Sequence, residues 1–397
     1  MSDLRSASGA AGPRAGVFVH TGKGLGGAQM VDAQLAQALS ARFAVDMVLL
    51  EGAPSVDRIR RMTGCELDTV EQRRPTYRIV PPRPSVRNLP RYLTDLLIRH
   101  RRMTSRYDLF ICSTHQAPPF SAADRSILYC HFPYGPHPKM DRTPGEDLGI
   151  RADVKSRLRA WLWDLRLDSY DTVLANSEFT ANWIERRWGR EAHVVYPPVT
   201  AEPPDAEKTD QVISIGRFSP DKRQDELIEA FRSFHRRAPG DWRLVLAGTC
   251  HPRHKFEPYL RKLRSRAGRL PVEFEIDIER DRLLHHLARA KLYWHGKGFG
   301  RDRRPRDREH FGISTVEAMR AGCVPVVPDE GGQKEIVSDD VGWRCDSHRE
   351  VVEVSLEMAR RKDLRRAMAE TARERSFRYS KRAFEERLRE LQIPGGV

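Results

Sequence analysis

The sequence predicts an α/β protein made of two similar halves, each a parallel sheet covered by helices on both faces. Short apolar runs that can form buried strands alternate with longer segments of helical periodicity. The alternation stops at one stretch rich in Pro, Glu and Asp, and then starts again. Ligands of open α/β sheets bind at the carboxyl ends of the strands, so we expect the site in a cleft between the halves.

The first half begins with an apolar strand at Ala15–His20, a glycine-rich loop and an amphipathic helix at Met30–Leu39. Further apolar runs of a length typical of buried strands follow along the chain. They are Ala44–Leu50, Leu109–Ser113, Ser126–Cys130, Thr172–Asn176 and His193–Tyr196. The stretch Pro197–Asp210 has no periodicity, and we interpret it as a linker.

The second half starts with a strand at Gln211–Gly216 and continues in the same alternation. Expected strands are Trp242–Ala247, Val272–Ile276, Lys291–His295 and Val324–Val327, and expected helices are Asp225–His235, Ser314–Ala321 and a tail from Arg349. We therefore expect a loose tail at 1–14, a first domain at 15–198, a linker at 199–207, a second domain at 208–378 and a last segment at 379–397.

The balance of charge is strongly positive, with 69 Lys and Arg against 55 Asp and Glu and a net charge of +14. Such an excess predicts an anionic partner, either nucleic acid, anionic lipid or a phosphorylated substrate. Nucleic acid is disfavoured, because the sequence has no zinc-finger spacing, RNA-binding aromatic motif or basic tail. It also has no apolar run long enough for a membrane span and no signal core, and its six cysteines are scattered, so we expect a cytoplasmic protein with reduced cysteines.

A glycine-rich segment between the first strand and the first helix reads His-Thr-Gly-Lys-Gly-Leu-Gly-Gly-Ala over residues 20–28. Glycines let a backbone approach a phosphate closely, and a helix start offers unpaired N–H groups. Gly22, Gly24 and Gly27 also match the dinucleotide fingerprint, with Glu51 where a ribose-binding acid would stand. An NAD-dependent oxidoreductase that uses the Gly22–Gly27 loop is therefore an alternative, although the loop favours another phosphate ligand; a plain tight turn also remains open.

Two cations follow the first strand of the second half, in Gly216-Arg217-Phe-Ser-Pro-Asp-Lys222. On a strand-to-helix turn, Arg217 and Lys222 can flank one pyrophosphate, with a planar fork from arginine and a point charge from lysine. The alternative is an exposed, solvated basic loop.

A third motif places two glutamates eight positions apart, in Glu309-His-Phe-Gly-Ile-Ser-Thr-Val-Glu317, with a helix starting between them. One ligand could meet a carboxylate for hydroxyls at Glu309, free N–H groups of the helix start for phosphate, and a second carboxylate for a ribose at Glu317.

This combination resembles the retaining glycosyltransferases of family 4 (group 1), which have the GT-B fold of two Rossmann-like domains facing each other across a cleft. The likeness spans nearly the whole chain and includes Tyr129–Pro133, Asn176–Thr180 and Gly331-Gly332 beside the motifs above. The wording Glu-His-Phe-Gly-Ile-Ser-Thr-Val-Glu is similar to Alg11-type mannosyltransferases and their prokaryotic relatives. The resemblance also implies that the last helix, Lys381–Leu391, packs back toward the first domain.

The resemblance implies a hexosyltransferase that uses a UDP- or GDP-linked sugar, retains its anomeric configuration and transfers it to a hydroxyl acceptor, which in this family is often lipid-linked. The expected catalytic residues are His131, near the sugar 6-hydroxyl, and Glu309, which holds donor hydroxyls and is not assigned as a nucleophile. Each expected donor-binding residue also takes a role from the family: Arg217 and Lys222 at the diphosphate, Glu317 at the ribose, the backbone of Phe311, Gly312 and Ile313, and the close-approach glycines Gly26 and Gly27.

No cofactor or metal is expected, because Arg217 and Lys222 would take the role that a metal has elsewhere and no Asp-x-Asp is present. Two departures from the family pattern stand out. Gln29 replaces the usual glutamate after Gly-Gly-Ala, and a cationic insertion at 296–308 directly precedes the motif with the two glutamates, Glu309 and Glu317. We interpret the insertion either as a solvated loop or as a lid that contacts an anionic donor or acceptor.

Two basic amphipathic helices are expected in the first half, near Leu89–Met103 and Val154–Asp168. Trp161 and Trp163 on the second would suit a membrane interface. Ordinary packing of one apolar stripe with a solvated basic face is the other interpretation. The resemblance leaves open that these helices dock the protein on the inner face of an anionic membrane.

Overall fold

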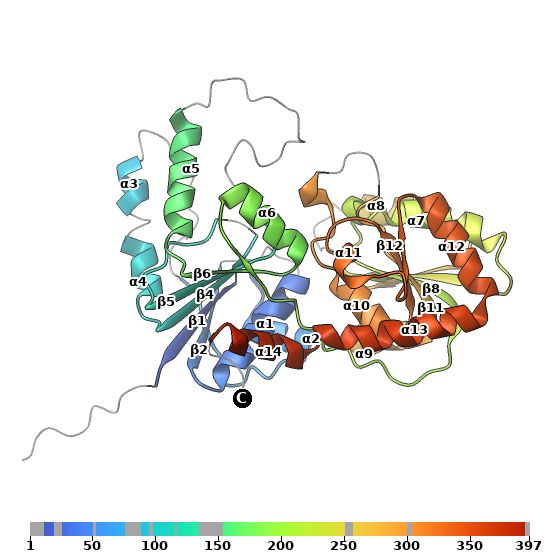
Figure 1. Cartoon of the computed structure of the whole chain (residues 1–397), viewed down its shortest axis with the longest axis horizontal. Helices are drawn as coiled ribbons and strands as arrows, with labels where there is room; N and C mark the ends of the chain where they lie inside the picture. Colours follow the sequence, from blue (N-terminus) through green and yellow to red (C-terminus); the bar gives the residue numbers. More distant parts are fainter. Residues whose placement is uncertain are drawn as a thin grey trace, which may run out of the picture.

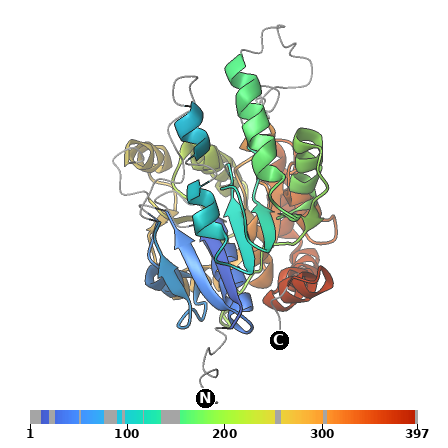
Figure 2. The ribbon, with the colours of Figure 1, turned by 90° about the vertical axis from the view of Figure 1, so that its left-hand side faces the viewer.

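The computed structural model describes residues 12–19, 26–50, 53–75, 89–94, 98–115, 117–134, 154–250, 257–299 and 304–393. Within this part the strands form two wholly parallel sheets, one of seven and one of six strands, each covered by helices (Figures 1 and 2). The predicted α/β class with two parallel sheets is confirmed.

The first sheet has the strand order β3-β2-β1-β4-β5-β6-β7. Its strands are β1 Arg14–Val19, β2 Ala44–Leu49, β3 Glu71–Arg73, β4 Leu109–Thr114, β5 Arg125–Cys130, β6 Thr172–Ala175 and β7 His193–Val194. The helices around it are α1 Gly27–Ser40, α2 Val56–Thr63, α3 Leu89–Thr94, α4 His100–Thr104, α5 Val154–Leu167 and α6 Glu178–Trp188. The described residues of the predicted helix 89–103 thus lie in α3, in a short π-helical turn at 98–99 and in α4, and 95–97 lie outside the description.

The second sheet has the order β10-β9-β8-β11-β12-β13. Its strands are β8 Thr209–Ile215, β9 Arg243–Gly248, β10 Val272–Ile276, β11 Ala290–Trp294, β12 Val324–Pro328 and β13 Trp343–Cys345. The helices are α7 Gln224–His235, α8 Glu257–Ala267, α9 Arg280–Arg289, α10 Ile313–Arg320, α11 Gln333–Ile336, α12 His348–Arg360, α13 Lys362–Ser376 and α14 Lys381–Glu390, with short 3₁₀ turns at Pro220–Lys222 (η3), Pro305–Asp307 (η4) and Phe377–Tyr379 (η5).

Local sequence explains where several helices begin and end. Ser177 caps α6 by accepting a hydrogen bond from the Thr180 N–H, and Gly189 ends that helix in the left-handed conformation. Ser380 caps α14 in the same way. The apolar face of α14, with Phe384 and Leu388, lies in the core of the first sheet, so the chain crosses back to the first half (Figure 1). The residue limits given above for the two domains stay a prediction.

Candidate active site

The centre of the second sheet positions the motifs that follow its strands. There β8 lies beside β11, and the chain winds outward from this pair in opposite directions. Such a point leaves a crevice at the carboxyl ends of the strands. The turn after β8 carries Arg217 and Lys222, and the turn after β11 carries His295 and Lys297. The sequence predicted the first turn as part of the site but selected no residue in the second.

Lys222 and Glu309 form a partly buried ion pair at this edge. The Lys222 Nζ lies 2.8 Å from Glu309 Oε2, and each side chain is 18% exposed. His295 Nε2 lies 3.1 Å from the same oxygen. Burial alone would raise the pKa of Glu309, but the charges of Lys222 and Lys297 and the hydrogen bond with His295 outweigh it and hold that pKa well below its usual value. Glu309 is therefore an ionised carboxylate.

A chain of hydrogen bonds behind His295 orients Glu309. Burial lowers the pKa of His295, although Glu309 opposes this, so the imidazole is neutral. A carboxylate only accepts hydrogen bonds, which assigns the proton to Nε2 and leaves Nδ1 to accept from the Tyr293 hydroxyl at 3.0 Å. That hydroxyl lies 2.8 Å from Ser314 Oγ. The sequence signal for Tyr293 and His295 is their spacing of two at the end of a strand, which puts both on one face.

Two glycines hold the backbone of the Glu309 loop. The Gly332 N–H donates to the Glu309 carbonyl at 2.9 Å. A Cβ at Gly331 would lie 2.2 Å from that carbonyl oxygen, and a Cβ at Gly332 would lie 2.4 Å from the carbonyl oxygen of His310. The loop can therefore approach this turn only where side chains are absent.

The start of α10 carries the other predicted donor-binding residues of this loop. Gly312 precedes the helix with φ +125°, and Ile313 is its first residue. The N–H groups at such a start have no partners within the helix and can bind an anion. Phe311 is buried, with its ring 5.7 Å from that of Tyr196, so only its backbone can face a ligand. Glu317 is 8% exposed on its side chain and lies 2.7 Å from Arg280 Nη2.

Arg217 is more exposed than Lys222, the other cation of this turn. Its side chain is 62% exposed, and its guanidinium lies 4.0 Å from the carboxylate of Asp221. The Arg217 carbonyl accepts a hydrogen bond from the Gln224 side chain at 2.7 Å. The backbone of Arg217 is thus fixed, while its guanidinium remains able to move onto a ligand.

In the first domain, His131 directly follows β5. Its Nε2 lies 2.8 Å from Ser113 Oγ, and its ring centroid is 4.7 Å from that of His115. Burial and then the nearby His115 hold the pKa of His131 well below its usual value, so this imidazole is also neutral. A neutral imidazole can offer one donor and one acceptor to a sugar hydroxyl and to Ser113.

Direct contacts join the loops that carry His131 and Glu309. Phe132, next to His131, stacks on His310, next to Glu309, with centroids 4.1 Å apart and rings 9° from parallel. Ser177 Oγ donates to the His310 carbonyl at 2.6 Å. The structure therefore brings the two predicted catalytic loops into contact across the boundary between the sheets, although they are 178 positions apart in the sequence.

The described part of the glycine-rich loop also reaches this boundary. A Cβ at Gly27 would lie 2.7 Å from Ile313 Cδ1, so the start of α1 packs on the start of α10. The Gln29 side chain accepts from the Gly26 N–H at 2.6 Å and so caps α1 as a glutamate could. Gly22, Gly24 and Glu51 lie outside the described residues.

A further contact across the boundary was not predicted from the sequence. Glu335 accepts hydrogen bonds from the backbone N–H groups of Glu178 at 2.8 Å and Phe179 at 2.7 Å, at the start of α6. A carboxylate at this end of a helix is favoured by the unpaired N–H groups and the helix dipole. Burial nevertheless raises the pKa of Glu335.

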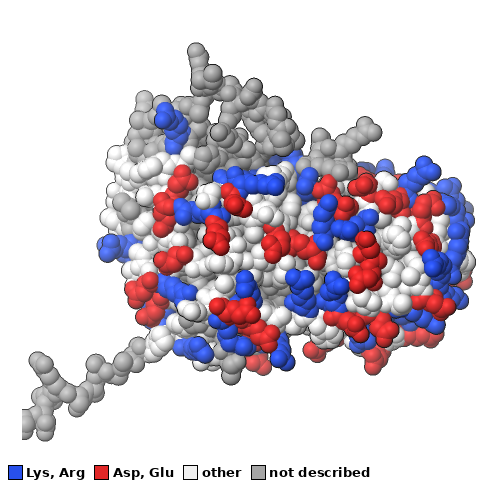
Figure 3. Space-filling model, viewed as in Figure 1, with Lys and Arg blue, Asp and Glu red and all other residues white. Residues whose placement is uncertain are grey.

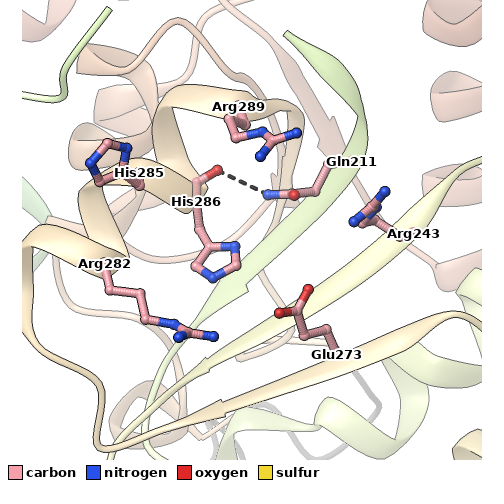
Figure 4. A pocket seen from close by; sticks show the side chains of 7 residues that line it. All are labelled: Gln211, Arg243, Glu273, Arg282, His285, His286 and Arg289. Atoms are coloured by element: carbon pink, nitrogen blue, oxygen red, sulfur yellow. Dashed lines mark hydrogen bonds between the residues drawn. The ribbon is translucent and has the colours of Figure 1, made fainter. Parts of the chain in front are cut away.

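A second hollow lies at the opposite end of the second sheet (Figure 4). Its volume is about 490 Å³, and it is lined by Gln211, Arg243, Glu273, Arg282, His285, His286 and Arg289. Within the described residues, Glu273, Glu275 and His286 also place possible metal ligands within 4.8 Å of one another. Glu275, however, already accepts from Arg282 and lies 3.1 Å from His286. This hollow is at the amino ends of its strands, so it is not part of the crevice that holds Glu309.

The described surface bears on the predicted membrane contact. Trp161 on α5 is 52% exposed, whereas Trp163 is 7% exposed and packs in the core against Trp188. For Trp163 the structure therefore bears out core packing, the second of the two interpretations of this helix. Among the described helices, none is long and apolar enough to cross a bilayer. On the face in Figure 3, basic and acidic side chains are interspersed over both halves.

Comparison with known families decides what this arrangement belongs to. Residues 25–202 match the family model described as Glycosyltransferase Family 4, and residues 200–375 match the model described as Glycosyl transferases group 1. The chain belongs to glycosyltransferase family 4. Its members transfer a sugar from a nucleotide-sugar donor, so the NAD-dependent alternative is not retained.

Characterised relatives and solved structures agree with this membership. The family 4 chain is 31% identical over 255 residues to the human GDP-Man:Man(3)GlcNAc(2)-PP-Dol alpha-1,2-mannosyltransferase and 29% identical over 250 residues to that of Neurospora crassa. These matches cover 57% and 53% of the chain but only 49% and 43% of the relatives, so the chain aligns with less than half of each. The structure of Anabaena HepE with UDP and glucose matches with a TM-score of 0.67 at 17% identity, covering 96% of this chain and 99% of that one; WaaG matches with 0.63 at 17%, covering 96% and 100%. The fold is GT-B.

Proposed function

We propose that this protein transfers a hexosyl group, with retention, from a UDP- or GDP-linked sugar to a hydroxyl acceptor. One observation carries the proposal: the partly buried cluster of Lys222, Glu309 and His295 lies at the carboxyl ends of β8 and β11, beside the start of α10. This crevice combines cations and helix N–H groups for a diphosphate with an ionised carboxylate for sugar hydroxyls.

The chemistry of transfer explains why cations and dipoles are needed there. When the bond between the anomeric carbon and the phosphate breaks, its electron pair remains on the departing nucleoside diphosphate. Lys222 and the N–H groups of Phe311, Gly312 and Ile313 would stabilise that developing charge, because they are fixed before the reaction. The Arg217 guanidinium would add to this by moving onto the diphosphate. The small Gly26 and Gly27 would let the first-domain loop close over the donor.

The two carboxylates and His131 have separate roles in this proposal. Glu309 accepts hydrogen bonds from donor sugar hydroxyls, and His295 and Tyr293 hold it in that orientation. Glu317 binds the ribose while Arg280 neutralises its charge. His131 supports the sugar near its 6-hydroxyl from the other domain. Glu309 acts as a positioning carboxylate in this scheme, and the acceptor hydroxyl gives its proton to the departing phosphate.

The relatives suggest which substrates to test first. The human and Neurospora proteins are named for GDP-mannose and a dolichol-diphosphate-linked acceptor, and the HepE structure holds UDP and glucose. We therefore propose a nucleotide-sugar donor from the UDP or GDP series and a lipid-linked saccharide as acceptor. Since Arg217 and Lys222 supply the positive charge, we also propose that no metal or other cofactor is required, and EDTA should leave the initial rate unchanged.

A lipid-linked acceptor would place the enzyme at a membrane. We propose that it is cytoplasmic and binds the inner, anionic face peripherally through its first domain, where the exposed Trp161 on α5 can enter the interface. Flotation with vesicles of phosphatidylglycerol and phosphatidylcholine at low salt tests this. Binding that weakens in Trp161→Ala supports it, whereas equal recovery from neutral and anionic vesicles contradicts it.

A donor screen tests the proposed function directly. The protein is incubated with UDP- and GDP-sugars, and released nucleotide is measured by mass spectrometry. With the active donor, Glu309→Gln, Lys222→Met and Arg217→Met should each lower kcat by about 100-fold, as the loss of a preorganised charge contact does. The exposed Glu207→Gln is the matched control and should retain full activity. Unchanged turnover in all three site variants would refute the assignment.

A further inference from the structure

The turn that follows β11 holds Lys297 in a built position. A Cβ at Gly296 would lie 2.6 Å from the Lys222 carbonyl oxygen, and Gly298 has φ +120° with its Cβ position 3.2 Å from the Pro328 side chain. Phe299, 4% exposed, anchors the far side by packing its ring 4.4 Å from that of His348. The backbone on both sides of Lys297 is thus packed against the domain, so this lysine belongs to a fixed turn.

The ammonium group of Lys297 lies in the Glu309 cluster without a direct partner. Its electrostatic neighbours are Glu309, Lys222, Asp221 and Arg217, in order of influence. Within the described part of the chain, no hydrogen bond or ion pair engages this ammonium group, and the side chain is partly buried. Burial lowers the pKa of Lys297. A partly desolvated cation that lacks a partner is costly, which points to an anionic ligand.

The carboxylates near Arg217 and Lys222 leave a role for a third cation at the diphosphate. Lys222 is paired with Glu309 at 2.8 Å, and Arg217 has Asp221 at 4.0 Å. Lys222 is thus shared with Glu309, and Arg217 is exposed beside Asp221, so neither offers its full charge to a diphosphate, which carries about two negative charges before transfer and gains another as it leaves. Lys297 is the charge in excess among these five groups. Its turn packs on the backbone of Lys222, whose side chain is paired with Glu309, the residue proposed to contact the sugar. This neighbourhood favours the phosphate attached to the sugar as the group that Lys297 meets.

We propose that Lys297 is a third cation of the donor site and binds the distal phosphate, the one whose oxygen leaves the anomeric carbon. This inference rests on the proposed function. The electron pair of the breaking bond stays on that phosphate oxygen, and Lys297 neutralises it while Lys222 remains shared with Glu309. Lys297 is then a residue that touches the substrate. It lies in the cationic insertion at 296–308, for which the sequence allows either a solvated loop or a lid.

Nucleotides with and without the distal phosphate provide the test. Calorimetry measures the affinities of UDP, GDP, UMP and GMP for the wild type, Lys297→Met and the exposed Lys262→Met on α8 as matched control. We expect Lys297→Met to lower the affinity for the diphosphates by about 10- to 100-fold, as the loss of one charged hydrogen bond would. The affinity for the monophosphates should stay within twofold of the wild type. Lys297→Arg should recover part of the loss, and the thermal midpoints report whether each variant is folded.

Each other outcome overturns the inference in a different way. If Lys297→Met is folded and binds the diphosphate as the wild type does, Lys297 is not a phosphate ligand. If it binds the diphosphate normally but the whole nucleotide-sugar weakly, Lys297 acts only through Glu309. If the wild type binds neither diphosphate and releases no nucleotide from any sugar donor, the proposed function fails, and this inference fails with it.

Discussion

A buried carboxyl in α1 should make the stability of this protein fall as the pH rises. Asp32 is fully buried, and burial raises its pKa from 3.8 to about 8, with only partial opposition from the Ser113 side chain. The folded protein therefore keeps a proton that the unfolded chain releases above about pH 4, so stability declines between about pH 4 and pH 8. At about 1.4 kcal/mol per pH unit, the folded state at pH 7 is weakened by up to about 4 kcal/mol.

Asp32→Asn removes this titration while keeping the shape of a neutral carboxyl. The variant should be more stable than the wild type at pH 7, and the gap should shrink by about 1.4 kcal/mol for each pH unit down to pH 5. Urea unfolding followed by tryptophan fluorescence at pH 5, 6, 7 and 8 measures it. Asp205→Asn, an exposed position in the linker, is the control and should follow the wild type at every pH. If the free energy of unfolding changes with pH in the same way for the wild type and Asp32→Asn, the carboxyl at this site is not neutral in the folded protein.

Three other expectations follow from contacts described above. Gly332→Ala should lower kcat by about 100-fold with an unchanged circular dichroism spectrum, because its methyl displaces the loop of Glu309. Glu335→Gln should lower the thermal midpoint by an amount equivalent to about 1 kcal/mol, because the start of α6 loses a charged acceptor; an unchanged midpoint would mean that the contact does not form in solution. Ellman's reagent should react rapidly with at most one thiol of the native protein, Cys250, because the other five cysteines are buried.

The fold and the edge of the site could be predicted because both depend on local pattern. Buried parallel strands appear as short apolar runs, and a motif placed directly after such a run must lie at the carboxyl edge of the sheet. This locates Arg217 and Lys222 without knowledge of any contact. Glu309 follows no strand directly and is placed by the helix that starts after it and by the family resemblance. The register between strands need not be known for this inference, because the carboxyl ends of all strands in a parallel sheet lie at the same edge.

The partners of these residues could not be predicted, because they come from distant positions. Lys222 and Glu309 are 87 residues apart, and Glu335 reaches the start of α6 over 157. The sequence predicts His295 only as the last residue of a strand, whereas in the structure its side chain contacts Glu309. For Trp163 the sequence left two interpretations open, because an aromatic residue in an amphipathic helix fits a membrane interface and a protein core equally well. The packing against Trp188 decides for the core.

The net charge of +14 predicted an anionic partner, but the total is a poor guide to where that partner binds. Many surface arginines lie beside carboxylates, as Arg237 does beside Glu353 at 2.7 Å, and solvent screens them. In the crevice the surroundings are less polar, so one ammonium without a partner acts more strongly on a bound phosphate than several paired guanidinium groups outside. Neutralising Lys297 should therefore weaken diphosphate binding more than the combined loss of Arg360 and Arg361, although the second change removes twice the charge.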